Sequence, residues 1–256
     1  MAAKYVRYEE RGPVAVITYD RQERRNAWSV AMYREAVAAV ERANASAPIG
    51  AVVLTNAGPA FCAGVDLKER QEPADPQTGR SPNIGTLSME QDHSWVHLMA
   101  RSKPVIAAVD GAAVGAGVTQ ILPADIRVAS ARSSFWFPFV QHGFLPEIGC
   151  TALLPRIVGL GRALDICLSA ATLNATEALR IGLISHIVED GQLLETALKL
   201  AGRIASFPRL QVRLTKDLLH RNPLEPDPNV FLARETEAFV TIHKAARAAK
   251  THKAAS

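Results

Sequence analysis

The sequence reads Val105-Ile106-Ala107-Ala108-Val109 and continues directly into Asp110-Gly111-Ala112-Ala113-Val114-Gly115-Ala116-Gly117. The apolar run predicts a buried strand, and the small residues after it predict a tight turn into a helix. A second stretch has the same plan, because residues 60–67 (AFCAGVDL) follow the apolar run in residues 51–58 (AVVLTNAG). Turns into helices present unpaired backbone N–H groups and the positive end of a helix dipole. Two such turns side by side predict a pair of N–H donors that are aimed at one oxygen, worth about 3 kcal/mol per donor in acyl transfer.

Either turn by itself is also explained by close packing of a helix against a strand. Residues 111–117 (GAAVGAG) do not match the dinucleotide-binding pattern GxGxxG, and the chain contains no GKS or GKT phosphate loop. The functional prediction therefore depends on the two turns together.

Strand and helix patterns alternate through the first two-thirds of the chain. Residues 30–45 have apolar side chains at helical spacing, with Ser29 as the expected N-cap. The predicted strands are residues 14–19, 49–55, 105–109, 126–129, 135–137 and 183–188. Strands separated by helices predict an α/β fold with largely parallel pairing.

Helical patterns dominate from about residue 160. Thr176 is the expected cap of the helix that ends at Gly182, and later helices are expected to break near Pro208 and in residues 222–228. We therefore predict a core in residues 1–200 and a C-terminal helical region in residues 201–256.

The composition is that of an ordinary globular protein. Apolar residues make up 48% of the chain and charged residues 21%, and no apolar run approaches the roughly 20 residues of a membrane helix. The first residues lack the apolar segment of a secretory signal, and the three cysteines have no metal-ligand spacing, so a cytoplasmic location is expected. A net charge of +4 suits an anionic ligand, but it is too small to indicate nucleic-acid binding by itself, so nucleic acid is an unlikely partner.

Several short elements, in order along nearly the whole chain, resemble the crotonase superfamily, which includes the enoyl-CoA hydratases and isomerases. They are Arg25-Asn26-Ala27, AFCAGVDL at 60–67, KPVIAAV at 103–109, GAAVGAG at 111–117, ADIR at 124–127, EAL at 177–179 with GLI at 182–184, and EAF at 237–239. The resemblance implies a spiral of ββα units with a C-terminal helical region that packs into trimers, often paired as hexamers. It also implies an acyl-CoA thioester as the ligand, no separate cofactor because CoA is part of the substrate, and no metal.

The same resemblance assigns residues. The N–H groups of Val65 and Ala116 would form the oxyanion hole, which survives because an alanine at 116 keeps the N–H of the usual glycine. The residues that would lie along CoA are Arg25, Ala27, Ala63, Asp66 and Leu67.

The carboxylates point away from ordinary hydratase chemistry. Hydratases of the superfamily use two glutamates, and the matching positions here hold Thr119 and Phe139, which cannot exchange protons near neutral pH. Glu147, in the stretch 143–151 (GFLPEIGCT), matches the place where 3-enoyl to 2-enoyl isomerases carry a catalytic glutamate. Apolar neighbours are expected to raise its pKa, and Phe139 is expected to wall a dry acyl pocket.

Other functions stay open. Glu147 could instead serve hydration or hydrolysis of an acyl-CoA, and the basic stretch 243–256 leaves room for a non-catalytic acyl-CoA-binding or RNA-binding protein. His93 and His97 are weak candidates for a base. Residues 70–90 are expected to form a long loop, and whether that loop closes over the substrate stays open.

Overall fold

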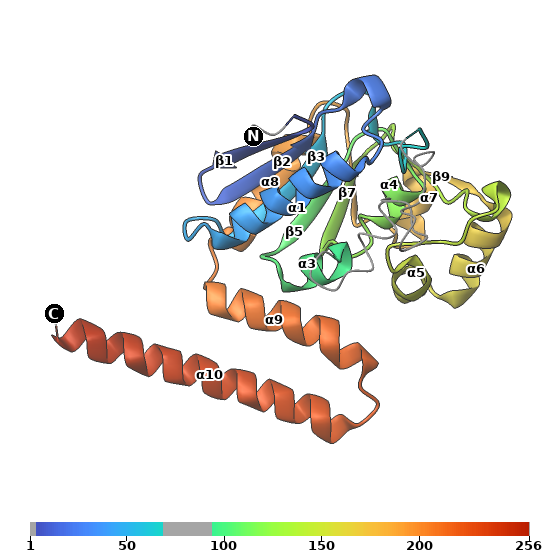
Figure 1. Cartoon of the computed structure of the whole chain (residues 1–256). Helices are drawn as coiled ribbons and strands as arrows, with labels where there is room; N and C mark the ends of the chain where they lie inside the picture. Colours follow the sequence, from blue (N-terminus) through green and yellow to red (C-terminus); the bar gives the residue numbers. More distant parts are fainter. Residues whose placement is uncertain (1–3, 69–93, 256) are drawn as a thin grey trace, which may run out of the picture.

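Two β-sheets form the centre of the molecule (Figure 1). The computed structural model describes residues 4–68 and 94–255. In the six-stranded sheet the order is β1-β2-β3-β5-β7-β10, with β1 antiparallel to β2 and every other neighbouring pair parallel. Its strands are β1 (Val6–Arg11), β2 (Val14–Tyr19), β3 (Ala51–Asn56), β5 (Val105–Val109), β7 (Ile126–Ser130) and β10 (His186–Val188).

The four-stranded sheet has the order β4-β6-β8-β9, in which β4, β6 and β8 run parallel and β9 is antiparallel to β8. Its strands are β4 (Ala60–Cys62), β6 (Ala112–Val114), β8 (Ser134–Trp136) and β9 (Thr172–Asn174). Three times in succession the chain makes a strand of the large sheet, then a strand of the small sheet, then a helix. This repetition confirms the predicted α/β spiral of ββα units.

In the part of the chain that the structure describes, the first two of these strand pairs are followed by α3 (Trp95–Arg101) and α4 (Ala116–Thr119). The sequence predicted plain turns where β4 and β6 lie, and that prediction was incomplete. Both strands are only three residues long, so they are too short to show the alternation that could reveal them.

The large sheet is covered on both faces. Along β2, β3 and β5 alternate residues belong to two separate buried clusters, as the side-chain alternation of a strand requires. Helix α1 (Val30–Ala45) lies on one face, and α8 (Leu193–Ala205) packs on the other against β2, β3, β5 and β7 (Figure 1). The predicted bounds of α1 are confirmed, and the Ser29 hydroxyl accepts a hydrogen bond from the Met32 N–H at 3.0 Å.

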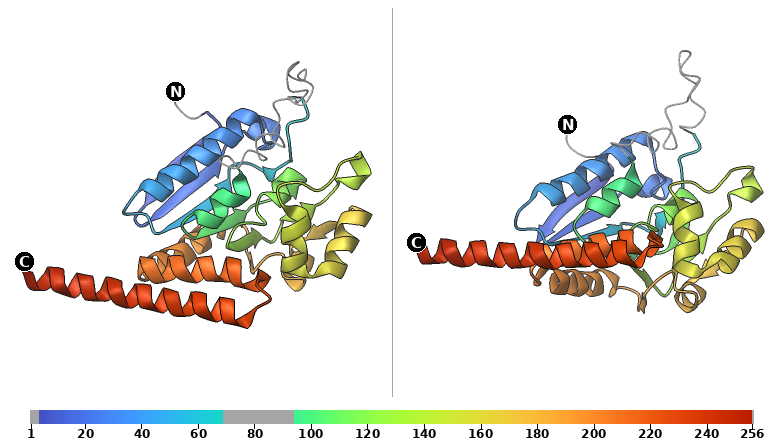
Figure 2. Two further views of the ribbon diagram at one scale, coloured as in Figure 1. Left: turned by 60° about the horizontal axis from the view of Figure 1, so that its bottom comes forward. Right: turned by 90° about the horizontal axis from the view of Figure 1, so that it is seen from below.

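The remaining helices are α5 (Cys150–Val158), α6 (Leu160–Ser169), α7 (Ala175–Arg180), α9 (Arg209–Arg221) and α10 (Pro228–Ala255). The predicted cap Thr176 was wrong: Asn174 caps α7, because its side chain accepts the Glu177 N–H at 2.8 Å. The breaks near Pro208 and after residue 221 are confirmed. Helices α9 and α10 pack together, and α10 runs well past the body of the molecule (Figure 2).

The described residues contain no helix long and apolar enough to span a bilayer. Nor do they contain a group of three or more His, Cys, Asp or Glu side chains placed to hold a metal ion. The domain boundary predicted at residue 200 falls inside α8 and stays a prediction.

Asp125 attaches α9 to the base of the large sheet. Its carboxylate accepts the Val105 N–H at 2.7 Å and contacts Lys216 Nζ at 2.8 Å and His220 Nε2 at 3.2 Å. Burial raises the pKa of Asp125, but the hydrogen bond from His220 and the charge of Lys216 outweigh that effect, so its pKa lies below the ordinary value. The folded state therefore holds Asp125 ionised.

We predict that Asp125→Asn lowers the free energy of unfolding by about 2 to 4 kcal/mol at pH 7, because Lys216 would lose its buried partner. A carboxyl whose pKa is depressed on folding gives stability that is complete above the unfolded pKa of about 3.9 and is lost as the pH falls through the folded pKa. The difference between wild type and variant should thus shrink below about pH 4. Urea unfolding across the pH range measures it.

Glu195→Gln is the matched control, since the Glu195–Lys199 pair is exposed and should leave stability unchanged within error. An Asp125→Asn effect that stays the same from pH 7 to pH 2 would contradict the linkage.

Candidate functional site

The two turns predicted from the sequence lie against each other. Strands β4 and β6 pair in parallel, with Ala60 opposite Ala112 and Cys62 opposite Ala113. A Cβ atom at Gly117 would lie 2.2 Å from the Cys62 carbonyl oxygen. The turns therefore meet backbone to backbone, at a distance that no side chain at residue 117 allows.

Gly111 and Gly64 make the same kind of contact. A Cβ at Gly111 would lie 2.1 Å from the Pro59 carbonyl oxygen, and Gly111 has a φ of +82°. Gly64 has a φ of +98°. A Cβ atom at Gly64 would lie 3.0 Å from the Val114 carbonyl oxygen and 3.9 Å from the Ala116 nitrogen. Val65 follows Gly64 directly, so its backbone lies beside the start of α4.

Backbone pairing sets the direction of the Val65 N–H. The Trp28 N–H donates to the Gly64 carbonyl at 2.7 Å, and the Asp66 N–H donates to the Trp28 carbonyl at 2.8 Å. In this parallel bridge Val65 is the middle residue, so its own N–H points away from Trp28. That side is the one on which β6 and α4 lie.

Ala116 is the first residue of α4 and is 2% exposed. The first N–H groups of a helix have no partner within the helix. The structure thus brings together the two predicted donors, the Val65 and Ala116 N–H groups, on either side of Gly64. An oxyanion hole needs this arrangement, and the role itself stays a prediction.

A left-handed corner holds the first turn. Arg25 and Asn26 have φ values of +50° and +54°, and Asn26 is fully buried. The Asn26 side chain accepts the Arg21 N–H at 2.7 Å and donates to the carbonyls of Ala57 and Ala60 at 2.9 and 2.8 Å. Asparagine is among the few residues that adopt this conformation readily. Asn26 belongs to the Arg25-Asn26-Ala27 element, but no local pattern in the sequence indicates this role.

Asp66 is buried between two arginines, with Arg21 Nη1 at 2.9 Å and Arg24 Nη2 at 2.9 Å from its oxygens. Burial raises the pKa of Asp66, but hydrogen bonds from Arg24, the Lys68 N–H and Arg21 outweigh it, so the pKa is lower than usual. This carboxylate is therefore ionised near neutral pH, and both arginines bind it.

The other residues predicted to line CoA fall into two groups. Arg25, Ala63 and Leu67 are exposed along the rim of the first turn, where the Ala63 N–H donates to the Arg25 carbonyl at 3.0 Å. Ala27 is buried, with 9% exposure. Their contact with CoA stays a prediction.

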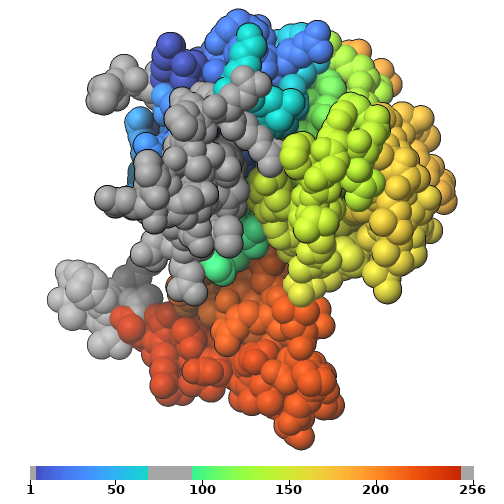
Figure 3. Space-filling view, turned by 45° about the vertical axis from the view of Figure 1, so that its right-hand side comes forward, coloured from blue at the N-terminus to red at the C-terminus, as the bar shows by residue number. Residues whose placement is uncertain are grey.

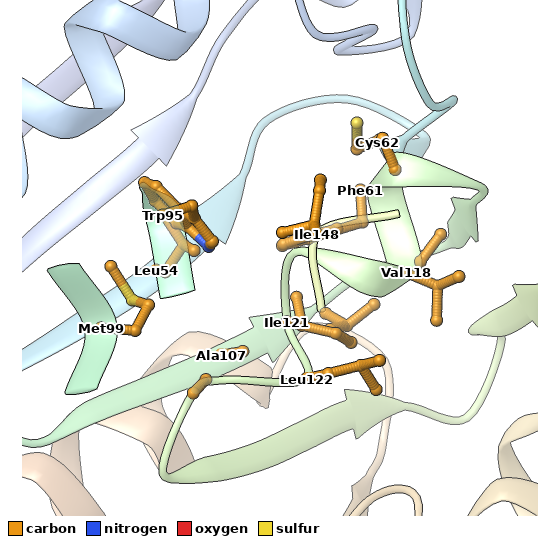
Figure 4. Close-up of a cluster of buried hydrophobic side chains, with 14 of the residues drawn as sticks. Leu54, Phe61, Cys62, Trp95, Met99, Ala107, Val118, Ile121, Leu122 and Ile148 are labelled. Carbon is orange, nitrogen blue, oxygen red and sulfur yellow. The ribbon is translucent and has the colours of Figure 1, made fainter. Parts of the chain in front are cut away.

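Glu147 lies in a turn that packs on α4. The next residue, Ile148, has a φ of +55°, which a β-branched side chain rarely adopts. Ile148 is held there by burial in one cluster with Phe61, Val118 and Ile121 (Figure 4). Glu147 itself is half-buried, and its carbonyl accepts the Cys150 N–H at 3.1 Å.

The apolar surroundings expected for Glu147 are present on one side only. Ile148 is buried, whereas Phe144 and Leu145 are 39% and 83% exposed. The chain around these residues, yellow-green in Figure 3, forms part of the molecular surface. Leu145 is therefore a surface residue, and the expected effect of the apolar neighbours on the pKa of Glu147 stays a prediction.

The positions of the missing glutamate pair are buried. Thr119 is 0% exposed and its hydroxyl lies 3.5 Å from the Ala116 carbonyl, while Phe139 is 6% exposed and belongs to the main core. Asp110 binds Arg132 Nη2 at 2.6 Å and Ser130 Oγ at 2.7 Å, and the hydrogen bond from Arg132 holds its pKa below the usual value.

Comparisons with known proteins match this geometry. The family model described as enoyl-CoA hydratase/isomerase matches residues 9–253. The chain belongs to the enoyl-CoA hydratase/isomerase family. Its relatives in this family include the short-chain-enoyl-CoA hydratase of Clostridium acetobutylicum, 36% identical over 90% of this chain and 86% of that protein.

A second relative is the 1,2-epoxyphenylacetyl-CoA isomerase of Escherichia coli, 36% identical over 81% of this chain and 78% of that protein. The crystal structure of an enoyl-CoA hydratase of the family from Bacillus anthracis superposes with a TM-score of 0.83 at 29% identity, covering 94% of this chain and 92% of that one. The predicted superfamily is thereby confirmed.

Two polar side chains that support the site escaped the sequence analysis. The Tyr19 hydroxyl donates to Gln120 Oε1 at 2.6 Å, and the Trp95 indole donates to the Gln120 carbonyl at 2.8 Å. Both bonds anchor the end of α4. Tyr19 and Gln120 are 101 residues apart in the chain, so no local pattern could have linked them.

Of the remaining candidate residues, Cys62 is buried and His97 lies on the surface. Burial raises the pKa of Cys62 to about 12, which agrees with a packing role. His97 is exposed on α3, whereas His93 and the loop predicted at 70–90 lie outside the described residues.

We predict that Gly117→Ala lowers the free energy of unfolding by about 2 to 3 kcal/mol and reduces turnover, because the new methyl group would push the two turns apart. Gly202→Ala in α8 is the control. Gly202 is also a helical glycine but has no atom within 4 Å of its Cβ position, so alanine there should stabilise by up to about 1 kcal/mol. Chemical unfolding compares the two, and equal effects would contradict the close-approach argument.

Proposed function

We propose that the protein is an enoyl-CoA isomerase that moves a carbon–carbon double bond with Glu147 as the single proton carrier. One observation carries the proposal: Glu147 lies in the turn that packs through Ile148 on α4, the helix that begins with Ala116. Asp66 and Asp110, which lie in the two turns, are ion-paired with arginines and have depressed pKa values. A carboxylate held ionised by arginines cannot accept and return a proton near neutral pH.

The reaction needs one base and a stabilised enolate. Glu147 removes a proton from the carbon between the thioester carbonyl and the double bond of a 3-enoyl-CoA. The negative charge moves to the thioester oxygen, where the Val65 and Ala116 N–H groups donate hydrogen bonds to it. Glu147 then returns the proton two carbons further along, which yields the 2-enoyl-CoA and restores the carboxylate.

The exposed residues along the rim of the first turn support CoA as part of the ligand. Arg25, Ala63 and Leu67 are exposed beside the first turn, which suits the nucleotide and pantetheine of CoA. Phe139 stands where a hydratase would hold its second glutamate, and its apolar ring would keep water away from the acyl carbons. No further cofactor is required, because the thioester itself makes the enolate accessible.

Hydration is the second candidate, and the names of the relatives favour it, since hydratase is commoner among them than isomerase. Addition of water requires one group to activate the water and another to protonate carbon. Thr119 and Phe139 supply neither. Hydrolysis by Glu147, or acyl-CoA or RNA binding without catalysis, would require no such pair.

We also propose a cytoplasmic assembly of three or six copies. The hairpin of α9 and α10 leaves Leu232, Phe239 and Val240 exposed on α10, which is more apolar surface than a lone helix usually presents to water. Burial against neighbouring copies would remove it, as the family resemblance implies.

Glu147→Gln should reduce the isomerisation rate of a 3-enoyl-CoA by a factor of about 10³ or more, because the amide cannot carry the proton. Acyl-CoA affinity, measured by calorimetry, should change little. Glu195→Gln, an exposed glutamate on α8, serves as the control and should keep full turnover. Unchanged turnover in Glu147→Gln would sink the assignment.

Product analysis in ¹⁸O-labelled water separates the candidate reactions. Isomerisation should convert 3-enoyl-CoA to 2-enoyl-CoA without ¹⁸O in the acyl group, whereas hydration would give a labelled hydroxyacyl-CoA and hydrolysis a labelled acid. Absence of all three products, together with a salt-dependent gel shift of RNA that deletion of residues 243–256 abolishes, would favour the binding protein instead.

A further inference from the structure

Two of the three cysteines meet between α5 and α6. Cys150 is the first residue of α5, and Cys167 lies in the last turn of α6. The two helices are joined at Gly159 and pack against each other (Figure 1). Cys150 stands nine residues before Gly159 and Cys167 eight residues after it, so the chain folds back and sets them opposite each other. The two thiols are close enough for each to shift the pKa of the other.

The two cysteines differ in their exposure to solvent. Cys150 is 1% exposed and belongs to the core, whereas Cys167 is half-buried and packs on its edge. The hydrogen bond from the Cys150 thiol also holds the pKa of Cys167 below its usual value, while it raises that of Cys150. Cys167 is thus the thiol that solvent reaches and that ionises first, and Cys150 is its enclosed neighbour.

We propose that Cys150 and Cys167 form a reversible disulfide when the protein meets a peroxide, and that this bond lowers turnover by displacing the turn that carries Glu147. The second half rests on the proposed function. Facing helices whose axes are about 8–10 Å apart bring opposed Cα atoms within the roughly 4.4–6.8 Å that a disulfide spans.

The chemistry balances with one peroxide. The Cys167 thiolate attacks a peroxide oxygen, the O–O bond breaks, and hydroxide leaves, which gives a sulfenic acid at Cys167. The Cys150 sulfur then displaces water from that sulfenic acid and forms the S–S bond. Overall two thiols and one hydrogen peroxide give one disulfide and two waters, with two electrons passing from sulfur to the peroxide.

Cys150 is bonded directly to the turn that carries Glu147. The Cys150 N–H donates to the Glu147 carbonyl, so the disulfide would pull on the same turn that aims the carboxylate. An S–S bond of about 2.05 Å is far shorter than the contact between two thiols, so the two sulfurs must approach each other, and we expect part of that movement at the start of α5. Ile148 keeps its left-handed conformation only because its packing holds it, and a small shift of α5 would release it.

The test is peptide mapping of the full-length protein after hydrogen peroxide, without reduction. Trypsin places the three cysteines in separate peptides: Cys62 in 43–68, Cys150 in 133–156 and Cys167 in 163–180. We expect the last two peptides to appear as one cross-linked species that dithiothreitol separates. Cys62 is fully buried and should stay unmodified, which makes it the internal control.

Cys167→Ser is the matched variant. Reduced, it should turn over as fast as wild type, and peroxide should leave its turnover unchanged. Wild type should lose about tenfold to a hundredfold in turnover on oxidation and regain it with dithiothreitol. Irreversible oxidation of Cys167, absence of the cross-linked peptide, or a cross-linked protein with full activity would overturn the proposal.

A second measurement keeps this result separate from the proposed function. If wild type converts no enoyl-CoA at all, the proposed function fails, but the peptide map still decides the disulfide. Hydrogen–deuterium exchange across residues 144–152 then reports the displaced turn, and exchange that is identical in the reduced and cross-linked protein would overturn that part.

Discussion

The carbonyl oxygen of Cys62 lies where a side chain at residue 117 would otherwise stand. This contact, with its counterpart between Gly111 and Pro59, brings two backbone segments about 50 residues apart in sequence into direct contact. Only then do the N–H groups that follow each segment lie near each other. A side chain at either glycine would separate the donors, and an oxyanion hole depends on their separation to within a fraction of an ångström.

Such a contact has to be held in place, because backbone segments gain little by meeting. The structure supplies buried polar bonds on both sides. Asn26 and the pairing of Asp66 with two arginines fix the first turn, and Tyr19 with Trp95 fixes the end of α4 through Gln120. Each of these polar groups is costly to bury unless its partner is present. These bonds therefore favour the arrangement of the turns in which each partner is in place.

The sequence predicts some parts of this arrangement well, and the reason is physical. The bounds of α1 and its Ser29 cap, the strands β2 and β5, and the two glycine turns all follow from local periodicity and local backbone chemistry. Local signals fail where the cause is distant. Three-residue strands such as β4 have too few positions for a pattern, and Asn174 rather than Thr176 caps α7 because the chain enters from β9. The exposure of Leu145 and the bond from Tyr19 to Gln120 are set by the tertiary fold, which apolar content alone does not reveal.

The backbone and the side chains contribute different groups to the proposed site. The N–H donors belong to the backbone, so substitution at residues 65 and 116 changes their shape but not their presence. Proton carriers belong to side chains and are lost by a single substitution, as Thr119 and Phe139 illustrate. On the proposed mechanism, a fold of this kind would keep its enolate-stabilising donors while its proton chemistry varies. On the proposal that Glu147 is the proton carrier, a reaction that returns its proton to the same molecule needs no second group, whereas addition of water does.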